Sequence, residues 1–484
     1  LRRALYGTRD APALWEAYAA AQLEALGFRR GKANARVYVH ARRKLKCLIH
    51  GDDFVFTGSR QHLEWVHREL SKTILLKRVG VLGPDSASDE VQEIRVLNRV
   101  LRLRDGGILY EADPRHAEIL ASMLAAPATP ISTPGVRTPS SDLRSLLVHD
   151  CRNPTSTTGD AHETPHIFGL SDSRDVGETG WGSGEEEEEW YGEEPREGPT
   201  TGRRPGRPGR RERDAGPAGV DAEEEQGCRA DGGVPLSAAE VTLYRATAAR
   251  ANYLALDRPD LAYAAKELCR RMSSPTIRDK LSLRRLCRYL LSAPRLTYFF
   301  GWQEPAQPLK VFCDTYFAGC VWTRRSTSGG CALHGRHLLK HWAATQKAIT
   351  LSSGEAELGG IVKGASEGIG LQALAADLDI GLSIQLHADS AAAIGICRRT
   401  GIGRVRHLAV GQLWIQERPR EKSLALYKVG GPATPADLLT KYLASAVIGT
   451  HLRVLHVGPN EGRPGSAPQV SADIQPWLTA PGKA

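Results

Sequence analysis

The run Leu309-Lys-Val-Phe-Cys-Asp314 is the starting point for interpreting this chain. Leu309, Val311 and Cys313 occupy alternate positions, at the period of two that characterises a β-strand. Asp314 closes the run, so we expect its carboxylate to project from that strand.

Two further runs lead to a carboxylate beside a helix start. Ile384-Gln-Leu-His-Ala-Asp389 alternates like a strand, and Ser390 then precedes the helix-prone Ala391–Ile394. Ser423–Val429 is also strand-like, and the helix-start signal Thr434-Pro-Ala-Asp437 follows it. The pattern predicts an α/β fold in which strand ends and helix starts can converge.

The segment Leu351-Ser-Ser-Gly-Glu-Ala-Glu357 has the composition of a helix start. Its two serines can cap the helix N-terminus, and apolar residues follow at positions 358, 361, 362, 365 and 369, which is helical spacing. Glu355 and Glu357 both border that apolar face, so periodicity does not choose between them. Glu355 also stands three residues after Ser352, which is the spacing of a capping box.

Four carboxylates thus stand at junctions that a compact fold can bring together: Asp314, Glu357, Asp389 and Asp437. Converging acids repel one another unless a divalent cation neutralises them. The chemistry that requires such a cluster is phosphodiester hydrolysis by two metal ions roughly 3.5–4 Å apart. Mg²⁺ is the natural ion, because it prefers carboxylates, water and phosphate oxygens. Spacing alone also fits helix capping, since Asp437 follows Thr434 as in a capping box.

Five motifs in this region follow one another in the order found in copia-type retrotransposon polyproteins, and the region resembles the ribonuclease H domain of that family. The resemblance implies that the catalytic, metal-binding acids are Asp314, Glu357, Asp389 and Asp437, and so selects Glu357 over Glu355. The motifs are Asp314-Thr-Tyr-Phe-Ala-Gly319, Arg324-Arg-Ser-Thr-Ser-Gly-Gly330, Leu351–Glu357, Ala388-Asp-Ser-Ala-Ala-Ala-Ile394 and Ala436-Asp-Leu-Leu-Thr-Lys441.

The same resemblance assigns residues 305–445 a ribonuclease H-like mixed five-stranded sheet with flanking helices. It implies a site with two Mg²⁺ ions, and nucleic-acid contacts through Arg324 and Arg325 of the second motif. The implied reaction is hydrolysis of the RNA strand of an RNA–DNA hybrid, which is recognised by backbone shape and 2′-hydroxyl groups rather than by base sequence.

Some residues depart from the family pattern. The family usually has a second Asp where Tyr316 stands, and an acidic residue where Ala409 stands, two positions after His407. His407 could assist product release or orient water in such a domain. We favour an ordinary surface histidine, in a helix expected over Leu408–Glu417.

The N-terminal region carries a weaker signal in Cys47-Leu-Ile-His-Gly-Asp52-Asp53-Phe-Val-Phe56. A lone Gly-Asp-Asp is also an ordinary hairpin turn. Preceded by Leu5-Tyr-Gly7 and Ala11-Pro-Ala-Leu-Trp15, however, it resembles the palm of a copia-type reverse transcriptase. That resemblance implies that Asp52 and Asp53 are the paired catalytic, metal-binding aspartates.

We therefore interpret residues 1–125 as a truncated reverse-transcriptase palm and thumb. This class of polymerase needs a third metal-binding Asp on an earlier palm strand, and the sequence is expected to begin after that strand. A site that lacks one of three ligands holds its metals poorly. RNA-directed DNA polymerisation is therefore not expected from this chain alone.

Periodicity is lost over residues 126–234, which include an unbroken acidic run at 185–189 and an arginine-rich tract at 203–211. With few aliphatic residues, this segment cannot bury enough apolar surface to offset its ordering entropy. It is predicted to be a low-complexity, disordered linker. The arginine tract either adds salt-sensitive affinity for phosphates or serves as a spacer.

Residues 235–300 resemble the helical connection between polymerase and ribonuclease H in the same family. A possible capping box, Ser237 with Glu240, opens the first helix. Basic residues of the last helix either track a duplex backbone or form a plain solvated face; they are Arg284, Arg285 and Arg288. The helices are expected over 238–255, 259–272 and 277–292, and a C-terminal tail over 446–484.

Composition limits the remaining choices. The 484 residues, 41% of them apolar, allow two to three domains, and the net charge of +9 favours nucleic acid as a partner over a membrane surface. Nine cysteines without a CxxC pair indicate free thiols in a reducing compartment. We find no apolar run of ~20 residues for a membrane span and no signal peptide. An intracellular protein, cytoplasmic or nuclear, is expected.

The sequence therefore predicts a fragment of a retrotransposon Pol polyprotein with Mg²⁺-dependent ribonuclease H activity and an incomplete polymerase half. Its expected partners are the RNA–DNA hybrid, template RNA and DNA, and other parts of the polyprotein, with no membrane. One alternative is a decayed element product without catalysis. The other is a non-enzymatic protein that binds nucleic acid non-specifically through its basic tracts.

Overall fold

A mixed five-stranded sheet lies in the C-terminal half of the protein, with the strand order β13-β12-β11-β14-β15. Strands β11, β12 and β13 pair antiparallel, whereas β14 pairs parallel with both β11 and β15. The mixed five-stranded sheet predicted from the sequence is confirmed in this computed structural model. The strands are β11 (Leu309–Tyr316), β12 (Thr327–His334), β13 (His337–Thr345), β14 (Ile384–Ala388) and β15 (Leu424–Lys428).

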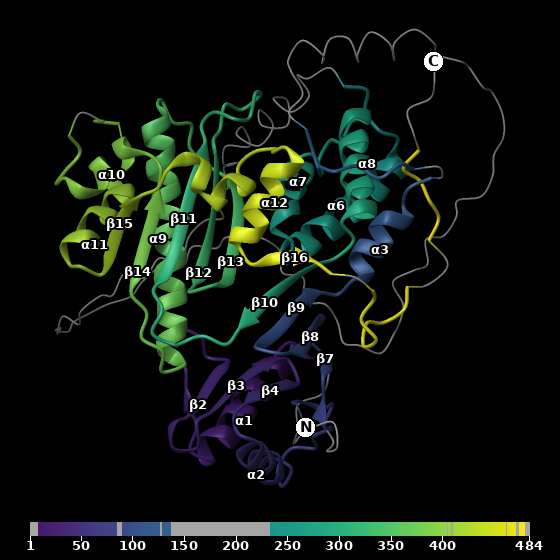
Figure 1. Cartoon of the computed structure of the whole chain (residues 1–484), viewed down its shortest axis with the longest axis vertical. Helices are drawn as coiled ribbons and strands as arrows, with labels where there is room; N and C mark the ends of the chain where they lie inside the picture. Colours follow the sequence, from purple (N-terminus) through teal and green to yellow (C-terminus); the bar gives the residue numbers. More distant parts are fainter. Residues whose placement is uncertain are drawn as a thin grey trace, which may run out of the picture. The chain divides into compact units, whose positions relative to one another are not determined.

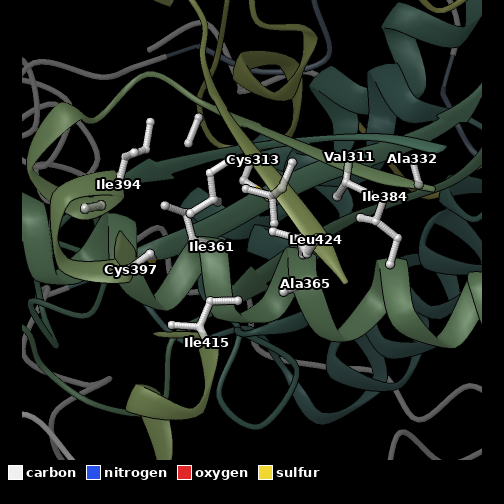
Figure 2. Packing of buried hydrophobic residues seen from close by; sticks show 14 of the residues in the cluster. Val311, Cys313, Ala332, Ile361, Ala365, Ile384, Ile394, Cys397, Ile415 and Leu424 are labelled. Atoms are coloured by element: carbon white, nitrogen blue, oxygen red, sulfur yellow. The ribbon is translucent and has the colours of Figure 1, made fainter. Parts of the chain in front are cut away.

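One face of this sheet is covered by α9 (Ser353–Asp377), which runs along β11 and β14 (Figure 1). The helix can lie close to β11 because Gly360, Gly364 and Gly368 face the sheet on successive turns. The apolar core fills the space between helix and sheet (Figure 2). Side chains labelled there include Val311, Cys313, Ile361, Ala365, Ile384 and Leu424.

The opposite face of the sheet is also buried. Cys331 and Leu333 of β12 pack there against Leu438 and Leu452, in a second apolar cluster. Because both faces are covered, seven of the eight residues of β12 are buried and its sequence lacks a clear alternation. The covering elements are α7 (Pro259–Cys269), α12 (Ser445–Val454) and the 3₁₀ helix η4 (Pro435–Leu439).

Three helices lie within residues 235–300, as the sequence predicted. Ser237 and Glu240 form the expected capping box, and Pro259 opens the second helix. The second helix ends at Cys269, three residues before the predicted end. The helices are α6 (Ala238–Ala255), α7 (Pro259–Cys269) and α8 (Ile277–Ser292).

A second five-stranded sheet combines strands from three distant parts of the sequence, in the order β16-β10-β9-β8-β7. Helix α3 (Arg115–Ser122) packs with α6 and α8 in a shared core. Residues expected as a C-terminal tail contribute α12 and β16, and Leu478 is fully buried in that core. The strands are β7 (Glu93–Val96), β8 (Arg99–Arg104), β9 (Gly107–Ala112), β10 (Leu296–Gly301) and β16 (Val457–Pro459).

The N-terminal sheet has the order β1-β2-β3-β4, and α1 and α2 pack against one face. The chain turns at Lys44, which has a φ of 52°. The chain turns again at Gly51 and Asp52, so that Asp53 begins β4. The elements are α1 (Ala11–Ala25), β1 (Arg29–Arg30), β2 (Val37–His40), η1 (Ala41–Arg43), β3 (Leu45–His50), β4 (Asp53–Thr57) and α2 (Arg60–Leu70).

The structure describes residues 8–84, 90–125, 128–136, 233–403, 405–407, 410–460, 462–470 and 474–479. Most of the predicted linker therefore lies outside the described residues, and its disorder stays a prediction. Within these ranges, no helix combines the length and apolarity needed to cross a bilayer. The remaining elements are β5 (Val81–Leu82), β6 (Glu90–Val91), α10 (Ala391–Arg398), η2 (Val410–Gln416), α11 (Glu417–Arg420) and η3 (Gly431–Ala433).

Candidate active site

Three of the four predicted acids converge at one end of the C-terminal sheet. Asp314 lies near the end of β11, Asp389 follows β14 directly, and Glu357 lies in the first turns of α9. Each of the three offers a carboxylate oxygen, and these oxygens all lie within 4.8 Å of one another. The arrangement is a group of ligands that could hold a metal ion.

Local sequence signals hold these three residues in position. The Ser352 hydroxyl accepts a bond from the Glu355 N–H at 3.3 Å and caps α9, and Ser390 caps α10 through the Ala393 N–H at 3.2 Å. β11 and β14 are parallel neighbours, so Asp314 and Asp389 emerge at the same edge. The caps thus fix two helix starts beside two strand ends.

Burial and mutual repulsion make this cluster electrostatically unfavourable without a cation. Desolvation, together with the charges of Asp314 and Asp389, raises the pKa of Glu357 to about 8. Desolvation and Asp314 also raise the pKa of Asp389. Glu357 is only 9% exposed, and its Oε2 is buried without a hydrogen-bond partner. An orphaned, buried carboxylate oxygen on a member of a group of three acids fits a divalent cation.

Asp437 lies beside this group but outside it. It belongs to η4, and its Oδ1 forms an ion pair with Lys441 Nζ at 2.9 Å. Desolvation and Asp314, opposed by Lys441, raise the pKa of Asp437 to about 6. Thr434 makes no side-chain capping bond, so the capping-box alternative for Asp437 does not hold.

Two residues that were not singled out as site residues in the sequence analysis contact Asp314. Thr440 is fully buried and donates its hydroxyl hydrogen bond to Asp314 Oδ2. Lys441 Nζ lies 3.6 Å from the same oxygen. A sequence signal existed, because both residues end the motif Ala436–Lys441, one helical turn after Asp437.

Glu355 makes hydrogen bonds at the start of α9 and with His407. It accepts hydrogen bonds from the Leu351 N–H and the Ser352 hydroxyl, both at 3.0 Å, and contacts His407 Nε2 at 2.9 Å. Although burial raises the pKa of Glu355, His407 and the Leu351 N–H outweigh burial and lower it. Glu355 is thus a capping residue outside the metal-ligand group.

The expectation that His407 lies on the surface is confirmed, but its placement in a helix is not. His407 lies in a turn, and within the described residues the helical segment begins at Val410 with the 3₁₀ helix η2. The His407 side chain is 51% exposed and reaches the helix start that carries Glu357. Its contact with Glu355 links a sequence-distant turn to the edge of the acidic group.

The predicted nucleic-acid-binding arginines have different surroundings. Arg324 is exposed and Arg325 half-buried, in the connection between β11 and β12. The arginines of α8 instead bond within the chain: Arg284 Nε donates to Leu478 O, Arg285 to Thr133 Oγ1 and Arg288 Nε to Thr129 O. Their role in binding nucleic acid stays a prediction.

Asp52 lies on the turn between β3 and β4, and Asp53 is the first residue of β4; both are exposed. The Trp15 indole donates a hydrogen bond to Gly51 O at 2.8 Å and so holds the turn against α1. Among the described residues, neither aspartate belongs to a group of three or more potential metal ligands. Their catalytic role stays a prediction.

The sequence is similar to parts of several known proteins. No protein-family model matches the sequence. The retrovirus-related Pol polyprotein from transposon RE1 of Arabidopsis thaliana is 29% identical over 206 residues, which are 42% of this chain and 14% of that protein. The corresponding protein from transposon TNT 1-94 of Nicotiana tabacum is 27% identical over 186 residues, 38% of this chain and 14% of that protein. The chain is homologous to retrotransposon Pol polyproteins.

The predicted resemblance to retrotransposon Pol polyproteins is thereby confirmed. An uncharacterized mitochondrial protein of Arabidopsis thaliana is also 35% identical over 127 residues, 26% of this chain and 51% of that protein. The matched regions thus span about half of this relative and 14–16% of the Pol polyproteins.

Among solved structures, the foamy viral protease-reverse transcriptase in complex with dsDNA is similar. It has a TM-score of 0.38 and 10% identity, and the match covers 89% of this chain and 60% of that chain.

Proposed function

We propose that residues 305–445 of this Pol-related chain form a Mg²⁺-dependent ribonuclease H that hydrolyses the RNA strand of RNA–DNA hybrids. The observation that carries the proposal is the convergence of Asp314, Glu357 and Asp389, with oxygens within 4.8 Å, at the edge of a mixed sheet. The copia-type ribonuclease H motifs contain the same three acids in the same order.

The residues present fit a divalent ion. Asp314, Glu357 and Asp389 would hold it, because their carboxylates are partly desolvated and two of them have raised pKa values. When bound there, Mg²⁺ would act as a Lewis acid on the scissile phosphate and lower the pKa of the attacking water. The sequence-based prediction of two ions also requires Asp437 as a ligand. In the structure, however, the Asp437 carboxylate forms an ion pair with Lys441.

The chain's own groups would orient the reaction. The Thr440 hydroxyl holds Asp314 Oδ2, and Lys441 neutralises Asp437, so both acids keep fixed directions. Arg324, on the exposed connection after β11, is available to contact the nucleic-acid backbone. Products would end in a 5′-phosphate and a 3′-hydroxyl, as expected when water attacks phosphorus and the 3′-oxygen leaves.

Cleavage assays on matched duplexes test this proposal. An RNA–DNA hybrid, duplex RNA and duplex DNA are incubated with the whole chain in Mg²⁺ and then in EDTA. We expect cleavage of the RNA strand of the hybrid alone, and only with Mg²⁺. Asp314→Asn should abolish cleavage, whereas Glu355→Gln should keep most of it, because Glu355 caps the helix and holds no metal.

The outcome also separates the proposal from its rival. A folded protein that binds the hybrid but never cuts it would support the alternative of a decayed element product that only binds nucleic acid. Equal loss of cleavage in Glu355→Gln and Glu357→Gln, with folding intact in both, would contradict the assignment of Glu357 as the ligand.

A further inference from the structure

Asp314 belongs both to the acidic group and to an ion pair. Its carboxylate lies with those of Glu357 and Asp389 in the acidic group. Lys441 Nζ lies 3.6 Å from Asp314 Oδ2 and 2.9 Å from Asp437 Oδ1. The ammonium group therefore stands between two of the four acids that the resemblance assigned to a site with two metal ions.

The backbone that carries Lys441 is firmly anchored. Thr440, its neighbour, is fully buried and bonds Asp314. A Cβ added to Gly329 of β12 would lie 2.9 Å from the Leu439 carbonyl carbon, so this segment packs directly on the strand. The ammonium thus extends from a fixed base, and the i,i+4 spacing in and after η4 directs it to Asp437.

We propose that the Lys441 ammonium is the second cation of this site, so that the chain binds one divalent ion, at Asp314, Glu357 and Asp389, rather than two. This inference rests on the proposed function, because it concerns the same metal site. An ammonium is a compact charge with three donors, and it can serve two carboxylates at once. A second divalent ion between Asp314 and Asp437 would have to displace it and break both ion pairs.

The four acids therefore have two different roles. Asp314, Glu357 and Asp389 recruit the ion, and Asp437 fixes Lys441 next to it. Lys441 is therefore a positioning residue: it neutralises Asp314 and Asp437 before any metal binds. Its removal should leave a vacant cation position with two unneutralised carboxylates, which a second ion can fill.

Counting bound Mn²⁺ tests this without using activity. Free Mn²⁺ is measured by electron paramagnetic resonance during titration of the whole chain, and sites that persist in Asp314→Asn are subtracted. The variants are Lys441→Met, Lys441→Arg and the matched control Lys363→Met. Lys363 is exposed to a similar extent, 39% against 37%, and pairs with Glu367 at 3.2 Å.

We expect one Asp314-dependent ion in the wild type, Lys441→Arg and Lys363→Met, and two in Lys441→Met. Two such ions in the wild type, or one in Lys441→Met, would overturn the inference while leaving the proposed ribonuclease intact. No Asp314-dependent ion in the wild type would instead overturn the proposed metal site itself.

Thermal unfolding in EDTA gives an independent readout. Lys441→Met should lower the melting temperature more than Lys363→Met, because two neighbouring carboxylates lose their counter-charge. Excess Mn²⁺ should then raise the melting temperature of Lys441→Met more than that of the wild type. Equal melting temperatures for Lys441→Met and Lys363→Met in EDTA would contradict the proposed role.

Discussion

Gly364 of α9 lies so close to Cys313 of β11 that a Cβ on the glycine would overlap the cysteine Sγ. The contact belongs to a line in which Gly360 meets Thr315 and Gly368 meets Val311. This close approach brings the N-terminal turns of α9, and with them Glu357, to the strand end that carries Asp314. Helix packing and the acidic group are therefore parts of one arrangement.

Gly364→Ala should destabilise the protein by about 1–3 kcal/mol, because the added methyl overpacks a filled interface. The matched control is Gly370→Ala in the same helix, where an added Cβ meets no atom within 4 Å. That change should stabilise the helix by about 0.5–1 kcal/mol. Free energies of unfolding from urea titration measure both, and equal effects of the two substitutions would refute the packing argument.

The features that were predicted correctly from the sequence are those that depend on neighbouring residues. The alternation in β11 and β14 and the serine caps of α9 and α10 are set by neighbouring residues, so strand ends and helix starts were assigned correctly. Three of the four acids that they carry converge.

Contacts between distant parts of the chain were not predictable in this way. His407 meets Glu355 across 52 positions of sequence, and β16 pairs with β10 although it was expected in a tail. Lys441 was visible only as a neighbour of Asp437, because its approach to Asp314 depends on how η4 packs on β12. Such pairings are fixed by tertiary packing and leave no periodic signal.

Stability without metal should fall as the pH rises from about 4.5 to 8. The pKa of Glu357 is raised from its ordinary value of 4.5 to about 8, chiefly by desolvation, so the folded state retains a proton that the unfolded state releases. The retained proton on Glu357 stabilises the folded state fully at pH values below the pKa of the unfolded state. This stabilisation is lost as the pH rises through the pKa of the folded state. The loss is on the order of 3–5 kcal/mol.

Urea unfolding in EDTA at several pH values measures this dependence. Glu357→Gln cannot titrate and should flatten the curve, and saturating Mg²⁺ should flatten that of the wild type. If the wild type and Glu357→Gln lose stability in parallel between pH 4.5 and 8, Glu357 does not have the raised pKa.

Arg324 and Arg285 should respond differently to substitution. Arg324 is exposed in the connection between β11 and β12, so Arg324→Gln should weaken hybrid binding and reduce the log–log salt slope by about 1. Arg285 donates to Thr133 Oγ1 at 2.7 Å, so Arg285→Gln should instead lower stability by about 1 kcal/mol. Fluorescence anisotropy at several salt concentrations and urea unfolding separate the two effects. A reduced salt slope in Arg285→Gln would restore α8 as a nucleic-acid surface.

Residues 1–125, which we interpret as a truncated palm and thumb, should not extend a primer. Asp52 and Asp53 are exposed at the start of β4, and no third potential metal ligand joins them in the described part of the chain. Two carboxylates exposed to water hold Mg²⁺ weakly, because the ion gives up its hydration shell reluctantly. We therefore expect no dNTP incorporation on a poly(rA)–oligo(dT) template, with a reverse transcriptase of known activity as the positive control.

Asp53→Asn should be indistinguishable from the wild type in this assay and should retain hybrid cleavage, because the proposed ribonuclease site uses other residues. Incorporation by the wild type that disappears in Asp53→Asn would establish a working polymerase site and reverse this conclusion.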